Sequence, residues 1–186
     1  LFRSPGRNAL LAVTLAFMSI PSTVITVPLF LMYSKIGLVG TPWAVIIPQL
    51  ATPFGLYLMI IYAQTSIPVS LIEAAKLDGA NTWTIFWKVG FPLLSPGFVT
   101  VLLFTLVGVW NNYFLPLIML SDTNDYPLTV GLNMWLKMGA QGTANGQVPN
   151  NLIITGSLIA VVPLIIAFMF LQKYWQSGLA AGSVKQ

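Results

Sequence analysis

The chain has 186 residues, of which 56% are hydrophobic and only 6% are charged. A soluble domain of ordinary composition carries about 25% charged residues. The 8 basic and 4 acidic side chains here cannot cover a water-facing surface of this size. The sequence contains no Cys and no His, so it offers no disulfide, no thiolate site and few groups for metal-dependent or hydrolytic catalysis. Composition therefore predicts a polytopic membrane protein with no catalytic residues, no metal and no cofactor.

Four apolar segments are long enough to cross a hydrocarbon core about 30 Å thick, which takes about 20 helical residues. We predict membrane-spanning helices over residues 9–33, 43–63, 93–120 and 151–171, and hence an all-α transmembrane bundle. Every segment contains proline, which bends or interrupts a helix and favours packing against neighbouring helices. The prolines in question are Pro21, Pro28, Pro48, Pro53, Pro96, Pro116 and Pro163.

The positively charged residues predict the orientation of these spans. Six of them flank one side of the predicted bundle, namely Arg3, Arg7, Lys76, Lys88, Lys173 and Lys185, whereas the other side has only Lys35 and Lys137. By the positive-inside rule, both ends of the chain and the loop at residues 64–92 face the cytoplasm. The scattered cations do not form the single basic face of a nucleic-acid-binding protein. The first apolar segment is too long for a signal peptide.

The loop at residues 64–92 has the pattern of two short helices on either side of a sharp turn. Pro68 suits a first helical turn, and Ser70 with Glu73 fits a capping box. Gly79 can end the first helix in the left-handed conformation, and Asn81 or Thr82 can cap a second helix that runs through Lys88. Both helices have apolar sides that need another protein surface to cover them. Those sides consist of Leu71, Ala74, Ala75 and Leu77, and of Trp83, Phe86 and Trp87.

The spacing in this loop resembles the EAA loop of binding-protein-dependent importer permeases of the ATP-binding-cassette class. Glu73-Ala74-Ala75 is followed four residues later by Gly79, and Pro92 stands thirteen residues further on. Val89 and Phe91 replace residues that are usually Ile and Leu in that pattern. The resemblance extends over nearly the whole chain. Trp110–Tyr113 and the tail at residues 178–185 resemble the carbohydrate, maltose-permease-like branch.

The resemblance implies a mechanism and a set of partners. In the family, the loop docks into a cleft on a cytoplasmic ATPase dimer, whose closure drives alternating access. The residues that the resemblance assigns to this coupling are Glu73, Ala74, Ala75, Asp78, Gly79, Ala80, Phe86 and Pro92. Glu73 either pairs with a basic side chain of the ATPase or caps its own helix, and Asp78 stabilises the turn. A second permease subunit and an extracytoplasmic solute-binding protein are the other implied partners, together with membrane lipid.

Intact members of the family usually have six spans, so four spans here imply an N-terminal truncation. The start at Leu1 and the basic turn Arg3–Arg7, which looks like a loop between spans, suggest the same.

Substrate recognition is predicted at Trp110, Asn111, Asn112 and Tyr113. Amides and aromatic rings suit a sugar pathway, because amides bind hydroxyl groups and ring faces pack on sugar rings. Alternatively, the two rings belong to an interfacial aromatic belt and the amides bind neighbouring backbone. The stretch from Ser121 to Asn150 either contacts the solute-binding protein or lies on the partner permease.

These observations predict a permease subunit of an ATP-driven importer of a sugar or oligosaccharide in a bacterial or archaeal cytoplasmic membrane. No G-x-x-x-x-G-K-[ST] run occurs in the sequence, so another chain must hydrolyse the ATP. The alternatives are an importer permease for a different solute, an ion-coupled transporter or channel, and a membrane scaffold. Ion-coupled proteins often carry ionisable residues inside their spans, and none of the predicted spans has one.

Overall fold

The computed structural model describes residues 6–141 and 150–183, and every secondary-structure element within them is a helix. The predicted all-α fold is therefore confirmed for this part of the chain. The elements are α1 (Arg7–Met18), α2 (Ser22–Lys35), α3 (Trp43–Gln49), α4 (Pro53–Ser66), α5 (Val69–Leu77), α6 (Thr82–Ile85), the π-helix η1 (Phe86–Gly90), α7 (Phe91–Trp110), α8 (Phe114–Met119), the 3-10 helix η2 (Thr123–Asp125), α9 (Leu128–Gln141) and α10 (Asn150–Ser183).

Helices long and apolar enough to cross a membrane occur close to the predicted positions. They are Trp43–Ser66, Thr82–Trp110 and Asn150–Lys173, and the bent pair Asn8–Met18 and Ser22–Lys35 is a fourth candidate if it counts as one broken span. The helix bounds differ from those predicted. The predicted span 9–33 is interrupted at residues 19–21, and the predicted span 43–63 is interrupted at residues 50–52. In the predicted span 93–120, the helix ends at Trp110.

Proline accounts for two of these interruptions. Pro21 is the residue before α2, and Pro53 is the first residue of α4. Thr52 caps α4, because its hydroxyl oxygen accepts a hydrogen bond from the Gly55 amide at 3.1 Å. The remaining prolines lie within the helices α2, α3, α7, α8 and α10 and do not interrupt them. These are Pro28, Pro48, Pro96, Pro116 and Pro163.

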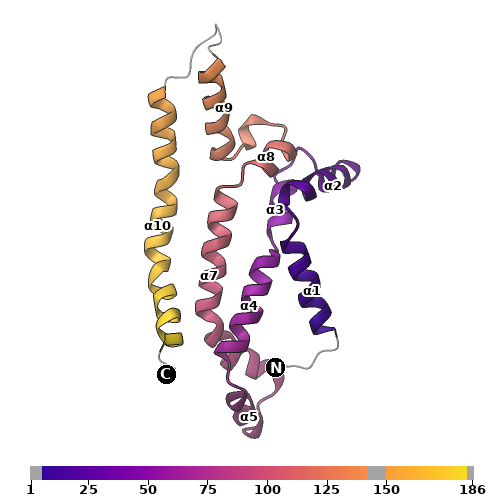
Figure 1. The fold of residues 1–186 in the computed structure, drawn as a ribbon, viewed down its shortest axis with the longest axis vertical. Helices are drawn as coiled ribbons and strands as arrows, with labels where there is room; N and C mark the ends of the chain where they lie inside the picture. The colour runs from indigo at the N-terminus through magenta and orange to yellow at the C-terminus, as the bar shows by residue number, and fades with distance from the viewer. Residues whose placement is uncertain (1–5, 142–149, 184–186) are drawn as a thin grey trace. The chain divides into compact units, whose positions relative to one another are not determined.

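The helices fall into two compact units, and α7 and α10 contribute to both. One unit contains α1, α4, α5, α6, η1 and most of α7, and within it α1 packs along α4 (Figure 1). Glycine allows α7 to approach α4 closely. A Cβ at Gly97 would lie 2.7 Å from Cδ1 of Tyr62, and one at Gly55 would lie 3.0 Å from Val101 Cγ1.

The other unit contains α2, α3, α8, α9, the end of α7 and most of α10. Its small core is formed where α8 packs against α2 and α3, and it centres on Tyr33, Ala44 and Met119. The Gly40 amide donates a hydrogen bond of 2.8 Å to the Met119 carbonyl and so ties the chain after α2 to the end of α8.

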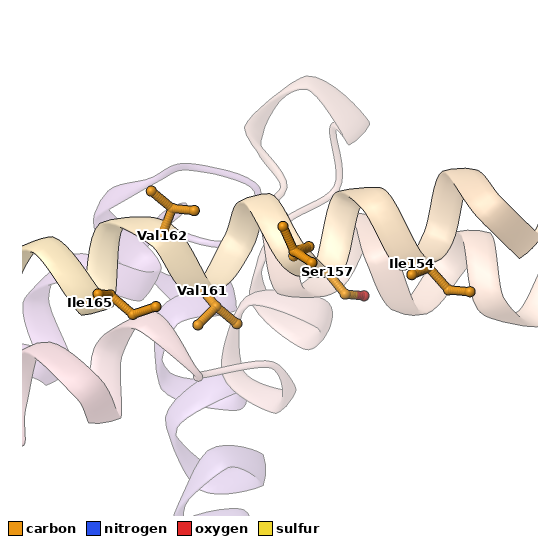
Figure 2. A pocket seen from close by; sticks show the side chains of 6 residues that line it. Ile154, Ser157, Val161, Val162 and Ile165 are labelled. Atoms are coloured by element: carbon orange, nitrogen blue, oxygen red, sulfur yellow. The ribbon is translucent and has the colours of Figure 1, made fainter.

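Many apolar side chains of the described residues remain exposed, and α10 is the clearest case. None of its most apolar window within Asn150–Lys173 is buried. One face forms an open groove lined by Ile154, Ser157, Leu158, Val161, Val162 and Ile165, all from α10 itself (Figure 2). The Ser157 hydroxyl donates a hydrogen bond of 2.8 Å to the Ile153 carbonyl, so the groove offers almost no free polar group. A surface of this kind is stable against lipid or other apolar helices, but not in water.

Candidate functional site

A sharp turn connects α5 and α6 in the predicted coupling loop. Gly79 has φ +78°, the left-handed conformation that the sequence predicts. The Ala80 amide donates to the Ala75 carbonyl and the Gly79 amide donates to the Lys76 carbonyl, both at 3.0 Å. These two bonds define a Schellman motif, which satisfies the last carbonyls of α5. The helix-turn-helix prediction is correct for this segment.

The start of α5 differs from the prediction. The helix begins at Val69 with Pro68 in the capping position, and no side chain caps it. Ser70 is then the second helical residue, where its hydroxyl cannot reach the amides that a capping box satisfies. The predicted capping box is therefore not formed. Glu73 is exposed and makes no hydrogen bond or ion pair with a described residue, which leaves its carboxylate available to a partner.

The second helix begins as predicted but does not stop near Lys88. The Asn81 side chain accepts a hydrogen bond from the Thr84 amide at 2.8 Å and so caps α6. The helix then continues through the π-turn η1 into α7. Pro92 explains the π-turn, because it has no amide hydrogen and its ring would clash with the carbonyl one turn earlier in a regular α-helix. The turn at Gly79 is thus connected directly to a candidate membrane span.

Large apolar side chains are exposed on both sides of the turn. Leu77 is 89% exposed and Trp83 is 73% exposed, while Ala74, Asp78 and Phe86 are also exposed. Ala75 and Ala80 are half-buried, so Ala74 presents a more open surface than Ala75 does. Exposed apolar groups in a short helical hairpin are typical of a surface that another protein covers. We call Val69–Phe86 the coupling unit.

The run Trp110–Tyr113 lies at the end of α7 and in the turn after it, and its side chains are largely engaged within their own unit. The Trp110 indole donates a hydrogen bond of 3.1 Å to the Ala160 carbonyl on α10. The Asn111 amide donates to the Val107 carbonyl at 3.0 Å. For these two residues the contacts favour packing over substrate binding.

The two remaining residues of the run contact groups that the sequence did not single out. The Asn112 amide donates to the Gln49 side chain at 3.4 Å, and the Asn112 carbonyl accepts from the Thr129 hydroxyl at 3.0 Å. The Lys137 amine lies 3.5 Å from the Tyr113 hydroxyl. These contacts join residues 17 to 63 positions apart, so no local sequence pattern could have found them.

One polar atom near this run lacks a partner. Asn133 Oδ1 is buried and has no hydrogen bond within the described part of the chain. Asn133 stands one turn after Thr129 and one turn before Lys137, so the three share one side of α9. No group of three or more carboxylates that could hold a metal occurs among the described residues.

Several sequence features lie outside the described residues. They include Arg3, Lys185, residues 142–149 of the stretch from Ser121 to Asn150 and the end of the tail at residues 178–185. The charge asymmetry that predicts the orientation of the spans depends partly on Arg3 and Lys185.

Residues 1–180 match the profile of a family described as "Binding-protein-dependent transport system inner membrane component". The chain belongs to this family. The resemblance seen in the Glu73–Pro92 spacing is therefore confirmed. Membership in the binding-protein-dependent permease family makes the chain a multi-pass protein of the inner membrane, in agreement with its candidate spans.

Curated relatives within the binding-protein-dependent permease family are named as transporters of sugars. The arabinooligosaccharides transport system permease protein AraQ of Halalkalibacterium halodurans is 33% identical over 180 residues, which cover 97% of this chain and 62% of the relative. The melibiose/raffinose/stachyose import permease protein MelC of Bacillus subtilis is 33% identical over 96% of this chain and 63% of the relative. The chain thus spans about three fifths of the length of these relatives.

A solved structure agrees with this placement in the permease family. A bacterial ABC transporter involved in the import of the acidic polysaccharide alginate matches with a TM-score of 0.73 and 30% sequence identity, over 93% of this chain and 63% of that one. This match confirms that the all-α arrangement of the described helices is that of an importer permease.

Proposed function

We propose that the chain is part of the permease subunit of an ATP-driven importer and receives force from a separate ATPase through the coupling unit. The observation that carries this proposal is the exposed apolar surface on both sides of the Gly79 turn. The turn is closed by two backbone hydrogen bonds, and the helix after it continues from α6 into α7. A push on α5 therefore reaches a candidate span through this one hydrogen-bonded turn.

The chemistry of the coupling unit suits docking into a cleft. Leu77 and Trp83 offer apolar surface, and Ala74 lets a partner backbone approach closely. Glu73 is an exposed carboxylate that can accept a paired hydrogen bond from an Arg of the partner. Asp78 stands at the C-cap of α5 and belongs to the turn rather than to the docking surface.

The transported solute is proposed to be a sugar or oligosaccharide. Relatives named for arabinooligosaccharides, for melibiose, raffinose and stachyose, and for diacetylchitobiose support this class. Asn112, Tyr113 and Gln49 supply amides and an aromatic ring in the turn after α7 and at the end of α3, and we propose this group for the pathway. Asn111 is assigned to packing because its side-chain amide already donates to the Val107 carbonyl. Trp110 is assigned to packing because its indole N–H is already used.

The proposed partners are an ATPase dimer, a second permease subunit and an extracytoplasmic solute-binding protein. The proposed orientation places the coupling unit in the cytoplasm. An ion-coupled transporter is less well supported, because Trp43–Ser66 contains no charged residue and the other two candidate spans have only Lys88 and Lys173, both near their ends.

Cysteine crosslinking tests the docking directly, since the chain has no native Cys. Ala74→Cys places a small reactive group on the exposed side of α5. We expect this variant to crosslink to the ATPase with a short reagent in at least one nucleotide state. The control Leu102→Cys, an exposed position inside α7, should not crosslink. Failure of Ala74→Cys to crosslink in every nucleotide state would refute the docking proposal.

A further inference from the structure

A row of three aromatic side chains runs along the helix that leaves the coupling unit. Trp87, Phe91 and Phe98 form this row, with ring centroids 5.2 Å apart between the first two and 5.1 Å apart between the last two. They are 55%, 40% and 40% exposed, so the described residues leave a substantial part of each ring uncovered. An aromatic surface of this length is costly in water and needs an occupant.

The helix carrying the row has the dimensions of a bilayer. Thr82–Trp110 is one helical segment of 29 residues, longer than the ~20 that a hydrocarbon core requires. No charged residue occurs between Phe91 and Trp110. Trp87 and Trp110 are separated by 23 positions, which corresponds to about 35 Å at 1.5 Å per helical residue. This separation slightly exceeds a hydrocarbon core of about 30 Å, so a span that begins near Trp87 is long enough to reach the opposite membrane–water interface.

The chemistry at the start of the row suits phospholipid headgroups. Trp87 combines an apolar ring with an indole N–H that donates to no described residue. The neighbouring Lys88 is exposed and makes no ion pair within the described part of the chain. An indole donor and an ammonium group complement the carbonyl and phosphate oxygens of a headgroup.

We propose that the aromatic row and Lys88 form a lipid anchor. Trp87 and Lys88 bind at the level of the phospholipid headgroups, and Phe91 and Phe98 lie among the acyl chains. The membrane surface then crosses the helix at η1, directly after the coupling unit. This proposal depends neither on the identity of the ATPase nor on the transported solute.

The anchor is distinct from the docking surface, although the two adjoin. Phe86 links them, because its ring lies 5.0 Å from Trp87 and 6.5 Å from Trp83. Phe98 stands 11 positions beyond Trp87, or about 16 Å along the helix, within the apolar part of α7. A water-soluble ATPase that reaches Trp83 cannot also reach Phe98 without entering the lipid.

Spin labels at single cysteines measure the depth of each position. Trp87→Cys, Phe91→Cys and Phe98→Cys would be made in the full permease, which is reconstituted in vesicles of phosphatidylethanolamine and phosphatidylglycerol. In vesicles without the ATPase, Leu77→Cys on the exposed surface of α5 is the aqueous control, and Leu102→Cys inside α7 is the control within the hydrocarbon core. The readout is the ratio of collision rates with dissolved oxygen and with a water-soluble nickel chelate.

The proposal predicts a ratio that is lowest at position 77, intermediate at 87 and severalfold higher at 91, 98 and 102, with the highest value at 98. Equal nickel accessibility at 77, 87 and 91 would overturn it, because the row would then lie in water or against the ATPase. Protection from both reagents at 87, 91 and 98 would also overturn it, because another protein segment would then cover the row. Each of the three labels reports separately, so a variant that fails to fold leaves two that decide.

Discussion

Replacing Gly79 by valine should uncouple the coupling unit without disturbing the spans. Gly79 has φ +78°, and a Cβ added there would meet nothing within 4 Å. The penalty therefore arises from backbone conformation alone, at about 1–2 kcal/mol for an L-residue in the left-handed region. A β-branched side chain is especially unfavourable there. A penalty of this size lowers the equilibrium constant for closing the turn by a factor of about 5–30, which is the upper limit for the fall in its population.

Gly79→Asn is the matched control, because asparagine tolerates the left-handed conformation and can end a helix in the same way. The assay is solute transported per ATP hydrolysed in proteoliposomes that contain the ATPase and the solute-binding protein. We expect coupled transport to fall by up to about 5–30-fold in Gly79→Val, with normal membrane insertion, and to be largely kept in Gly79→Asn. Wild-type transport by Gly79→Val, or equal loss in both variants, would show that the left-handed turn is not needed.

Three further substitutions test the packing and capping contacts. Gly97→Ala should destabilise the purified permease by about 1–3 kcal/mol, because the added Cβ would lie 2.7 Å from the Tyr62 ring. The control Gly108→Ala should not destabilise it, because a Cβ at Gly108 meets no atom within 4 Å. Asn81→Ala should lower the stability of the coupling unit by about 1 kcal/mol and speed its proteolysis, because the cap of α6 is lost. Asn81→Asp retains the cap and is the control. Trp110→Phe loses the indole donor and should reduce stability by about 0.5–1.5 kcal/mol in the same thermal assay. Unchanged stability in Gly97→Ala or Trp110→Phe, or unchanged proteolysis in Asn81→Ala, would refute the contact concerned.

Local chemistry made the coupling unit predictable from the sequence. A glycine adopts the left-handed conformation at low cost, and an asparagine caps the residues directly after it, so Gly79 and Asn81 reveal their roles within a few positions. The capping box at Ser70 failed for an equally local reason. Pro68 occupies the capping position, so Ser70 lies two residues too far into α5 to cap it.

The surroundings of Trp110–Tyr113 were not predictable in the same way. Their partners Ala160, Gln49 and Thr129 come from α10, α3 and α9, and only the fold brings them together. The aromatic row was likewise visible only as scattered rings in the sequence. Its contacts join positions four and seven apart, which share a face only if one helix runs unbroken through them, and the sequence predicts the second loop helix and the span as separate elements.

The location of Leu77 tests the central claim most directly. Leu77 is 89% exposed, so a cysteine there is open to a membrane-impermeant maleimide unless a partner covers it. We predict that Leu77→Cys reacts in inside-out vesicles stripped of the ATPase, is protected when the ATPase is added back, and does not react in intact cells. Reaction from outside intact cells, or reactivity that the ATPase leaves unchanged, would contradict the assignment of this segment as a cytoplasmic docking unit.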